Sequence, residues 1–165
     1  MIKAFNLKKI LTFIVPVLIP LAVGLLSSYV SGDFAQSYDS LVRPFYAPPQ
    51  IVFPIVWTFL YIIMGIALYL VIKDGFDKPG VREAVFYFAI TLILNFFWSP
   101  IFFRWNMILF ALVWLVGMIV FAVVNVYQFY KINKVAGVIM LLYLIWLLYA
   151  FALNLGFYIL NGPTI

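Results

Sequence analysis

The sequence predicts an all-α integral membrane protein, a five-transmembrane-helix bundle in a single domain over residues 1–165. Composition is the first observation behind this fold class: 68% of the residues are apolar and only 9% are charged, against about a quarter charged in a soluble domain. Histidine and cysteine are both absent. Their absence excludes disulfide frameworks, thiol nucleophiles and the commonest metal ligands, so no metal site and no catalytic residue is expected.

The spacing of the charges is the second observation. It leaves five uncharged runs of at least 20 residues, at 10–30, 44–72, 84–103, 105–130 and 135–165. About 20 helical residues cross a hydrocarbon core of about 30 Å, and these runs are too long and too uniformly apolar for barrel strands. Since proline is tolerated in a first helical turn, the second helix is expected to begin near Pro49. We expect spans at about 10–30, 49–72, 84–103, 107–130 and 135–160.

The basic residues alternate between the two sides of the predicted bundle. One side carries Lys3, Lys8, Lys9, Lys73, Lys78, Arg82, Lys131 and Lys134, and the other carries Arg43 and Arg104. This bias predicts a cytoplasmic N-terminus and a C-terminus outside. The net charge of +5 therefore needs no nucleic-acid partner. The partner expected is the lipid bilayer, and the lack of a basic tail after the last span favours a bacterial inner membrane over a mitochondrial outer membrane.

The connections differ in length. Residues 31–47 are rich in turn-forming residues and are expected to cover the mouth of the bundle. Short turns at 104–106 and 131–134 make the third, fourth and fifth spans antiparallel neighbours in sequence order. Gly24 and Ser28 have the small-xxx-small spacing that lets membrane helices approach closely, although such pairs also arise by chance.

The spans contain no ionisable group near the middle of the bilayer, which disfavours proton relays and ion pumps. Aromatic residues make up 21% of the chain. Helical spacing arranges some of them, with small and amide residues, into three stripes: Trp57, Tyr61, Gly65 and Leu68; Thr91, Asn95, Trp98 and Phe102; Tyr143, Trp146, Ala150, Leu153 or Asn154, and Phe157. Such stripes suit a pocket for a flat, mostly apolar ligand. The alternative is helix packing, with the Asn side chains bonding between helices.

Three blocks carry a resemblance to a known family. They are residues 40–61 with Met64 and Gly65, residues 94–103, and residues 143–154 with Leu160 and Asn161. Their order and content resemble the TspO/MBR family of tryptophan-rich sensory and translocator proteins. The resemblance implies a compact five-helix bundle, often a homodimer. It also implies a pocket that opens toward the first connecting loop and takes porphyrins, sterol-like molecules or benzodiazepine-like ligands.

The resemblance also implies the site residues. Those expected to line or support the pocket are Tyr46, Phe53, Trp57, Tyr61, Asn95, Trp98, Phe110, Trp146, Ala150, Leu153 and Asn154, and those expected to shape its lid are Pro44, Pro48 and Pro49. The chain departs from the family pattern at Tyr46 and Ile51, where tryptophan is usual, and at the pair Ser37-Tyr38. Fewer lid indoles weaken an inference of tryptophan photochemistry.

The leading functional hypothesis is a membrane protein that captures a hydrophobic planar molecule, such as a porphyrin or other tetrapyrrole, in order to sense, transfer or limit it. No cofactor is required, because the porphyrin is expected as a ligand. A light- and oxygen-dependent porphyrin-degrading enzyme is the first alternative, with tryptophan as the redox-active group. A transporter is the second, although the sequence has neither inverted repeats nor discontinuous helices.

Overall fold

The computed structural model describes residues 7–163, which form helices without a strand. The elements are α1 (Leu7–Ser31), α2 (Phe34–Ser40), α3 (Val52–Ile72), α4 (Val81–Ser99), the π-helical turn η1 (Pro100–Arg104), α5 (Ile108–Ile132) and α6 (Lys134–Asn161). Within this range five segments are long and apolar enough to cross a membrane: Ile10–Ser31, Val52–Ile72, Val81–Arg104, Ile108–Ile132 and Lys134–Asn161. The five-helix membrane bundle is confirmed, and each span lies within a few residues of its predicted position.

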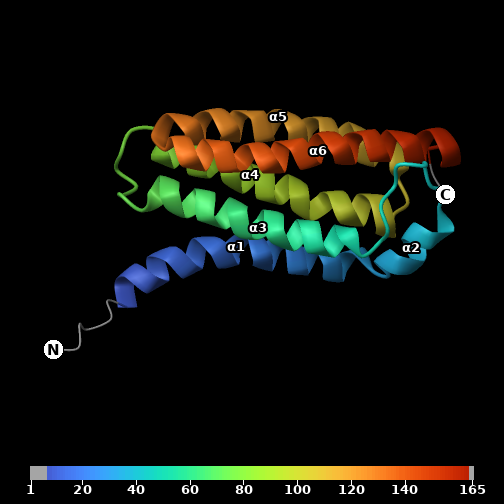
Figure 1. Cartoon of the computed structure of the whole chain (residues 1–165), viewed down its shortest axis with the longest axis horizontal. Helices are drawn as coiled ribbons and strands as arrows, with labels where there is room; N and C mark the ends of the chain where they lie inside the picture. Colours follow the sequence, from blue (N-terminus) through green and yellow to red (C-terminus); the bar gives the residue numbers. More distant parts are fainter. Residues whose placement is uncertain (1–6, 164–165) are drawn as a thin grey trace.

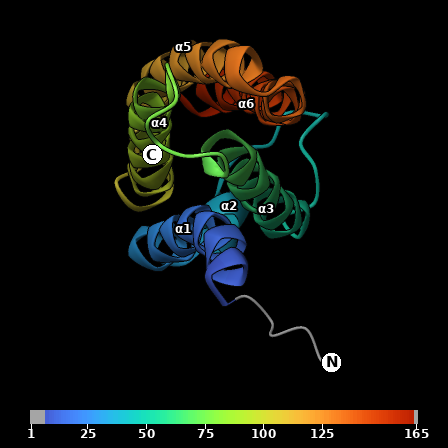
Figure 2. The same ribbon diagram turned by 90° about the vertical axis from the view of Figure 1, so that its left-hand side faces the viewer.

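The five long helices run side by side (Figure 1). Seen end-on, α5 and α6 form one side of the bundle, α1 forms the other, and α3 and α4 lie between them (Figure 2). The helix α4 packs on α5, and α5 packs extensively on α6, as the short turns predict. The short helix α2 and the C-terminus lie at the same end of the bundle, which we call the α2 end (Figure 1).

Ion pairs occur at both ends of the bundle. At the end opposite α2, Lys78 lies 3.2 Å from Asp74, and Arg82 lies 2.8 Å from Asp77. Exposed ion pairs of this kind contribute about 1 kcal/mol or less to stability. These basic residues therefore matter mainly as signals of membrane topology. Lys3 and the side chains of Lys8 and Lys9 lie outside the described residues. The orientation of the termini stays a prediction from the charges.

The connection after α1 is more ordered than its turn-rich sequence suggests. It contains α2, which begins because the Asp33 carboxylate accepts a hydrogen bond from the Gln36 backbone N–H at 3.1 Å. Gly32, with φ at +80°, turns the chain between the two helices.

The start of the second span also differs from its prediction. The helix α3 begins at Val52, not near Pro49, because residues 49–52 form a separate turn closed by a bond from the Val52 N–H to the Pro49 carbonyl. Pro48 lies outside the helix as well, since a residue before proline disfavours helical backbone.

The third span ends in a wider turn. Pro100 cannot donate a backbone hydrogen bond, and after Ser99 the helix changes from α to π geometry, in which the Trp105 N–H donates to the Pro100 carbonyl at 3.0 Å. The third span therefore ends in a one-turn π-helix. The wider turn places Phe102 and Phe103 in the interior.

A buried polar network joins α4, α5 and α6. Asn95 Nδ2 donates to the Tyr143 hydroxyl at 2.8 Å and to the Thr91 carbonyl at 3.1 Å. Asn125 Nδ2 donates to Thr91 Oγ1 at 2.6 Å and to the Phe121 carbonyl at 2.9 Å. Interhelical bonds of this kind are worth about 0.6 to 2 kcal/mol each in membranes. Asn95 therefore holds helices together, which was the alternative interpretation of its stripe.

Candidate functional site

Two adjoining cavities lie toward the α2 end of the bundle. The larger has a volume of about 660 Å³ and is lined by Leu18, Leu21, Ala22, Gly24, Leu25, Ser27, Ser28, Ser31, Phe34, Phe53, Pro54, Trp57, Thr58, Tyr61, Trp98, Ser99 and Phe103. The smaller has about 20 Å³ and is lined by Tyr38, Phe53, Trp57, Trp98, Phe102, Phe103, Trp146, Ala150, Leu153, Asn154 and Phe157. Ligand pockets usually measure about 300 to 1,000 Å³, so only the larger has room for a ligand of ordinary size.

An aromatic wall separates the two cavities. Its four members, Phe53, Trp57, Trp98 and Phe103, line both. The wall is held by ring contacts: Trp98 lies edge-on to Phe103 at 6.0 Å between centroids, and Trp57 stacks on Tyr61 at 5.5 Å. The flat side of a ring system in the larger cavity would therefore meet aromatic faces.

The polar side chains in the lining of the larger cavity are uncharged. Ser27, Ser28, Ser31, Thr58 and Ser99 contribute hydroxyl groups, and no Asp, Glu, Lys or Arg is part of the lining. The Ser27 hydroxyl donates to the Phe96 carbonyl at 2.7 Å, which leaves its oxygen lone pairs as acceptors. Among the described residues no cluster of His, Cys, Asp or Glu could hold a metal ion. The arrangement suits an apolar body with a hydrogen-bonding edge.

The smaller cavity is bounded by polar groups without partners. The indole N–H groups of Trp98 and Trp146 and the Oδ1 atom of Asn154 are buried and make no hydrogen bond within the described part of the chain. Buried polar groups are nearly always paired. A volume of about 20 Å³ accommodates one water-sized group. This cavity therefore suits a single polar atom that could accept from an indole.

The structure brings most of the predicted site residues together. Seven of them, Phe53, Trp57, Trp98, Trp146, Ala150, Leu153 and Asn154, line the smaller cavity, and Tyr61 lines the larger together with Phe53, Trp57 and Trp98. The expected single pocket is thus divided. Trp146, Ala150, Leu153 and Asn154 lie behind the aromatic wall, on the side with little free volume.

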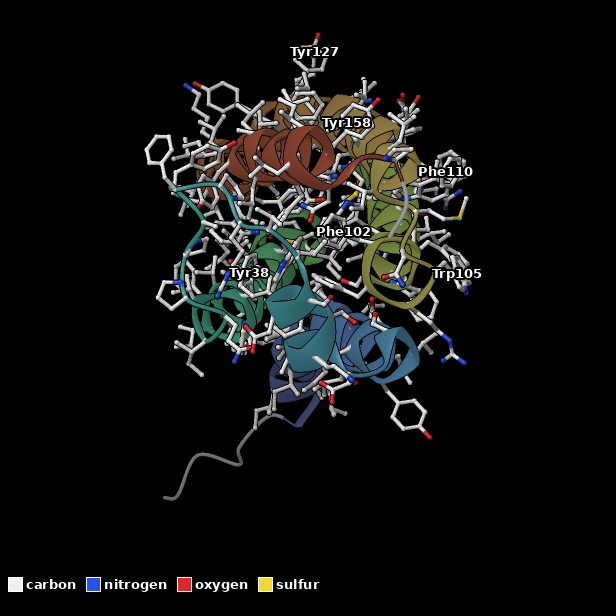
Figure 3. The ribbon with its side chains drawn as sticks, turned by 90° about the vertical axis from the view of Figure 1, so that its right-hand side faces the viewer. Tyr38, Phe102, Trp105, Phe110, Tyr127 and Tyr158 are labelled. Carbon is white, nitrogen blue, oxygen red and sulfur yellow. The ribbon has the colours of Figure 1, made fainter. Side chains whose placement is uncertain are left out.

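Three predicted residues line neither cavity. Asn95 belongs to the polar network, and Phe110 is 45% exposed and contacts the ring of Trp114. Figure 3 shows Phe110 and Trp105 on the outside of the bundle, whereas Tyr38 and Phe102 lie toward its middle. The third, Tyr46, lies in the loop between α2 and α3 and contacts α6. Spacing alone cannot show whether an aromatic residue of a membrane helix points into the bundle, because the inner and outer faces of such a helix are equally apolar.

The loop from Leu41 to Ile51 is tied to α6. The Tyr46 hydroxyl donates to the Ala152 carbonyl at 2.9 Å, and the Tyr149 hydroxyl donates to the Tyr46 carbonyl at 3.0 Å. Pro44 is buried against Gly156, where an added Cβ would overlap the Tyr46 hydroxyl and lie 3.0 Å from Pro44 Cγ. These contacts hold Pro44 and Tyr46 against α6, and Tyr46 lines neither cavity; the lid role of Pro44 stays a prediction.

The same loop is also held by a hydrogen bond from α2. The Tyr38 hydroxyl donates to the Pro48 carbonyl at 2.6 Å. Burial raises the pKa of the Tyr38 phenol, an effect that the nearby positive charge of Arg43 opposes. The phenol therefore keeps its proton at neutral pH and remains a donor. Pro48 is thus held by Tyr38, whereas Pro49 is exposed, and their roles in a lid stay predictions.

The contribution of α1 is what the sequence reasoning missed. Eight lining residues of the larger cavity come from this helix, for which the sequence spacing indicates only packing. Gly24 does pack closely, with the Tyr61 ring directly against its Cα, whereas Ser28 is exposed and lines the cavity. The hydroxyl-rich end of α1 was the available signal, since three serines follow one another within five residues at 27, 28 and 31.

The Asn161 side chain provides a direct test of the lid contacts. Its Oδ1 accepts from the Val42 N–H at 2.8 Å, and its Nδ2 donates to the Val42 carbonyl at 2.9 Å. Two bonds worth about 0.5 to 1.5 kcal/mol each are lost in Asn161→Ala, so amide exchange at Val42 should accelerate about tenfold or more. Hydrogen exchange in micelles measures this. Ser40→Ala, which removes only a local bond to the Ser37 carbonyl, should leave Val42 unchanged; equal rates in both variants would contradict the tether.

Comparisons with known proteins agree with this architecture. The sequence model of the TspO/MBR family matches residues 16–160. The "Tryptophan-rich protein TspO" of Chlorobaculum tepidum is 37% identical over 155 residues, which cover 93% of this chain and 98% of that protein. The "Tryptophan-rich sensory protein" of Cereibacter sphaeroides is 34% identical, over 71% of this chain and 72% of its own. The human "Translocator protein" is 34% identical, over 78% and 76%.

Proposed function

This chain belongs to the TspO/MBR family, and we propose that it binds a flat, mostly apolar ligand of the tetrapyrrole class inside the bundle. The observation that carries the proposal is the cavity of about 660 Å³ with an aromatic wall on one side and hydroxyl groups in its lining. The ring system would lie against Trp57, Trp98 and Phe103. Its polar edge would face the serines at the end of α1.

The energy of such binding comes mainly from apolar burial. Removal of apolar surface from water contributes about 25 cal/mol per Å², and contacts between aromatic rings add about 0.5 to 1.5 kcal/mol per pair. The cavity lining presents no charged side chain that would have to be desolvated. Recognition by shape and ring stacking is consistent with a protein that binds the ligand in order to sense it, transfer it or limit its amount.

The partnerless groups behind the wall support a second contact. The indole N–H groups of Trp98 and Trp146 are buried without acceptors in the described chain, and Trp98 belongs to the wall itself. A ligand that displaces the wall would bring an acceptor atom to these donors. Satisfying a buried donor recovers about 1 to 3 kcal/mol of desolvation cost. The divided site therefore favours ligands that combine a flat ring with a carbonyl, carboxylate or ring nitrogen.

Titration with protoporphyrin in the dark tests the proposal. Saturable changes in porphyrin absorbance are expected for the purified protein. Trp57→Leu removes a wall ring and should raise the Kd about tenfold, or about 1.4 kcal/mol. The control is Trp105→Leu, at a residue that is 51% exposed and lines neither cavity, which should stay within twofold.

Two results would count against this function. Absence of a saturable change in the parent protein would reject the tetrapyrrole, and equal weakening in both variants would reject the wall as the site. Illumination in air of the bound complex adds a separate readout. A new absorbing product that depends on Trp57 or Trp98 would favour a porphyrin-degrading enzyme instead.

A further inference from the structure

The larger cavity opens sideways, between two helices. Most of its lining is buried or half-buried, but six lining residues are exposed: Leu18, Ala22, Leu25 and Ser28 of α1, and Pro54 and Thr58 of α3. The four in α1 follow each other at intervals of three or four residues, and the two in α3 are four apart, so each set forms one stripe on its helix. Two facing stripes that are both exposed and part of a cavity mark its mouth.

The two helices close together below this mouth. A Cβ at Gly65 would overlap the Cα of Val17, so the backbones of α1 and α3 touch there. One further turn away, the rings of Phe13 and Tyr69 meet edge-to-face at 5.1 Å. The gap between α1 and α3 therefore lies on the α2 side of the contact between Val17 and Gly65.

The neighbouring seam between α1 and α4 is closed by hydrogen bonds. The Ser27 hydroxyl donates to the Phe96 carbonyl at 2.7 Å, and Arg104 Nη1 donates to the Val30 carbonyl at 2.9 Å. The α2 end is covered by the loop from Leu41 to Ile51, which is tied to α6 through Tyr46, Tyr149 and Asn161. A ligand that passed either way would have to break these bonds. Among the described residues of the mouth, α1 and α3 are joined by the contact of the Tyr61 ring with Gly24 and by no hydrogen bond, so only a side chain has to move.

Most of the mouth lies within one leaflet, and only its deepest residue, Leu18, reaches past the middle of the bilayer. Ser28 and Leu18 lie three and thirteen residues before the end of α1 at Ser31, which corresponds to about 4.5 and about 20 Å along the helix axis. Half of a hydrocarbon core is about 15 Å. The deeper part of the mouth is aliphatic, through Leu18 and Ala22, and hydroxyl groups occur only nearer α2, at Thr58 and Ser28. This order matches the polarity gradient of a leaflet.

We propose that the gap between α1 and α3 is a portal through which the flat hydrophobic ligand enters from the lipid, in the leaflet nearest α2. The inference rests on the proposed function for the identity of the ligand, and on the lining of the cavity for the route. It replaces the expectation that the pocket opens toward the first connecting loop. The ligand first partitions into the membrane and then moves sideways into the bundle.

Plugging the portal tests the route. Ala22→Phe and Thr58→Phe place a ring in the mouth from either helix, and Leu26→Phe adds the same ring to α1 at a residue that is 57% exposed and outside the lining. In nanodiscs, association and dissociation of protoporphyrin should both slow tenfold or more in the two plugged variants. Leu26→Phe should match the parent. Asn161→Ala, which loosens the lid, should leave both rates unchanged.

A second measurement does not depend on porphyrin binding. In nanodiscs made from phospholipids with brominated acyl chains, bromine that enters the mouth quenches Trp57 and Trp98. Ala22→Phe and Thr58→Phe should each lower the quenched fraction of tryptophan emission relative to Leu26→Phe. If the parent shows no porphyrin binding, the proposed function fails, and this comparison alone decides whether the cavity opens to lipid.

Several outcomes would overturn the portal. Faster dissociation without slower association in the plugged variants would mean that the added ring only occupies the site. Faster association in Asn161→Ala, with Ala22→Phe and Thr58→Phe unaffected, would place the route under the loop. Equal bromine quenching in the plugged and control variants would show that acyl chains do not reach the aromatic wall.

Discussion

Replacing Gly65 with alanine should cost about 2 to 3 kcal/mol of stability. The added Cβ would overlap the Cα of Val17 and lie 2.7 Å from the Pro16 carbonyl oxygen. Both are backbone atoms, so no side-chain rotation can relieve the collision, and α1 as a whole has to move away from α3. Overpacking of a well-packed interface typically costs about 1 to 3 kcal/mol. Because the atoms met here belong to the rigid α1 backbone, the cost should lie at the upper end of that range.

Thermal unfolding in detergent micelles measures the effect of Gly65→Ala. The matched control is Gly117→Ala in α5, where an added Cβ would meet no atom within 4 Å. Alanine is the better helix former, so the control should be neutral or slightly more stable. Equal melting temperatures for the two variants would mean that α1 and α3 are not in contact at Gly65.

Asn125→Asp should destabilise the protein by at least about 3 kcal/mol at neutral pH. Asn125 is fully buried between α4 and α5, and its Nδ2 donates to Thr91 Oγ1 and to the Phe121 carbonyl. An aspartate puts a negative oxygen against that carbonyl instead of a donor. A charged side chain in the middle of a membrane helix costs about 2.5 to 3.5 kcal/mol even on the milder insertion scale.

The same substitution at Asn133 is the control. Asn133 Oδ1 caps α6 by accepting from the Val135 and Ala136 N–H groups at 3.0 and 3.1 Å. A carboxylate accepts from the same two donors and interacts favourably with the helix N-terminus. Unfolding by a denaturing detergent should separate Asn125→Asp from Asn133→Asp. Similar losses in both would contradict the buried network.

The five spans could be predicted because they depend on composition. A charged side chain in hydrocarbon costs several times RT, so the fifteen charges are confined to the ends of the spans, and the runs between them mark the helices. The neighbour relations of α4, α5 and α6 followed from turns too short to allow any other placement. The start of α3 at Val52 was mispredicted and α2 was not predicted, because local turn and capping bonds decide both.

The site was only partly predictable, and Trp98 and Phe110 illustrate why. Both are aromatic residues in apolar runs, yet Trp98 is buried in the wall between the cavities and Phe110 lies on the outside. In a soluble protein the outer face of a helix is polar and identifies the inner one. In lipid both faces are apolar, so spacing groups residues into stripes without showing which stripe turns inward.

What the sequence by itself determined is the class of protein, the number and approximate limits of the membrane spans, and the family, since these depend on hydrophobicity, length and residue identity. What only the tertiary structure decided is the division of the site by Phe53, Trp57, Trp98 and Phe103, the part that α1 plays in it, and the tie of Tyr46 to α6. These depend on how side chains from distant helices fill shared space. Packing of that kind is a property of the assembled bundle, and no single span encodes it.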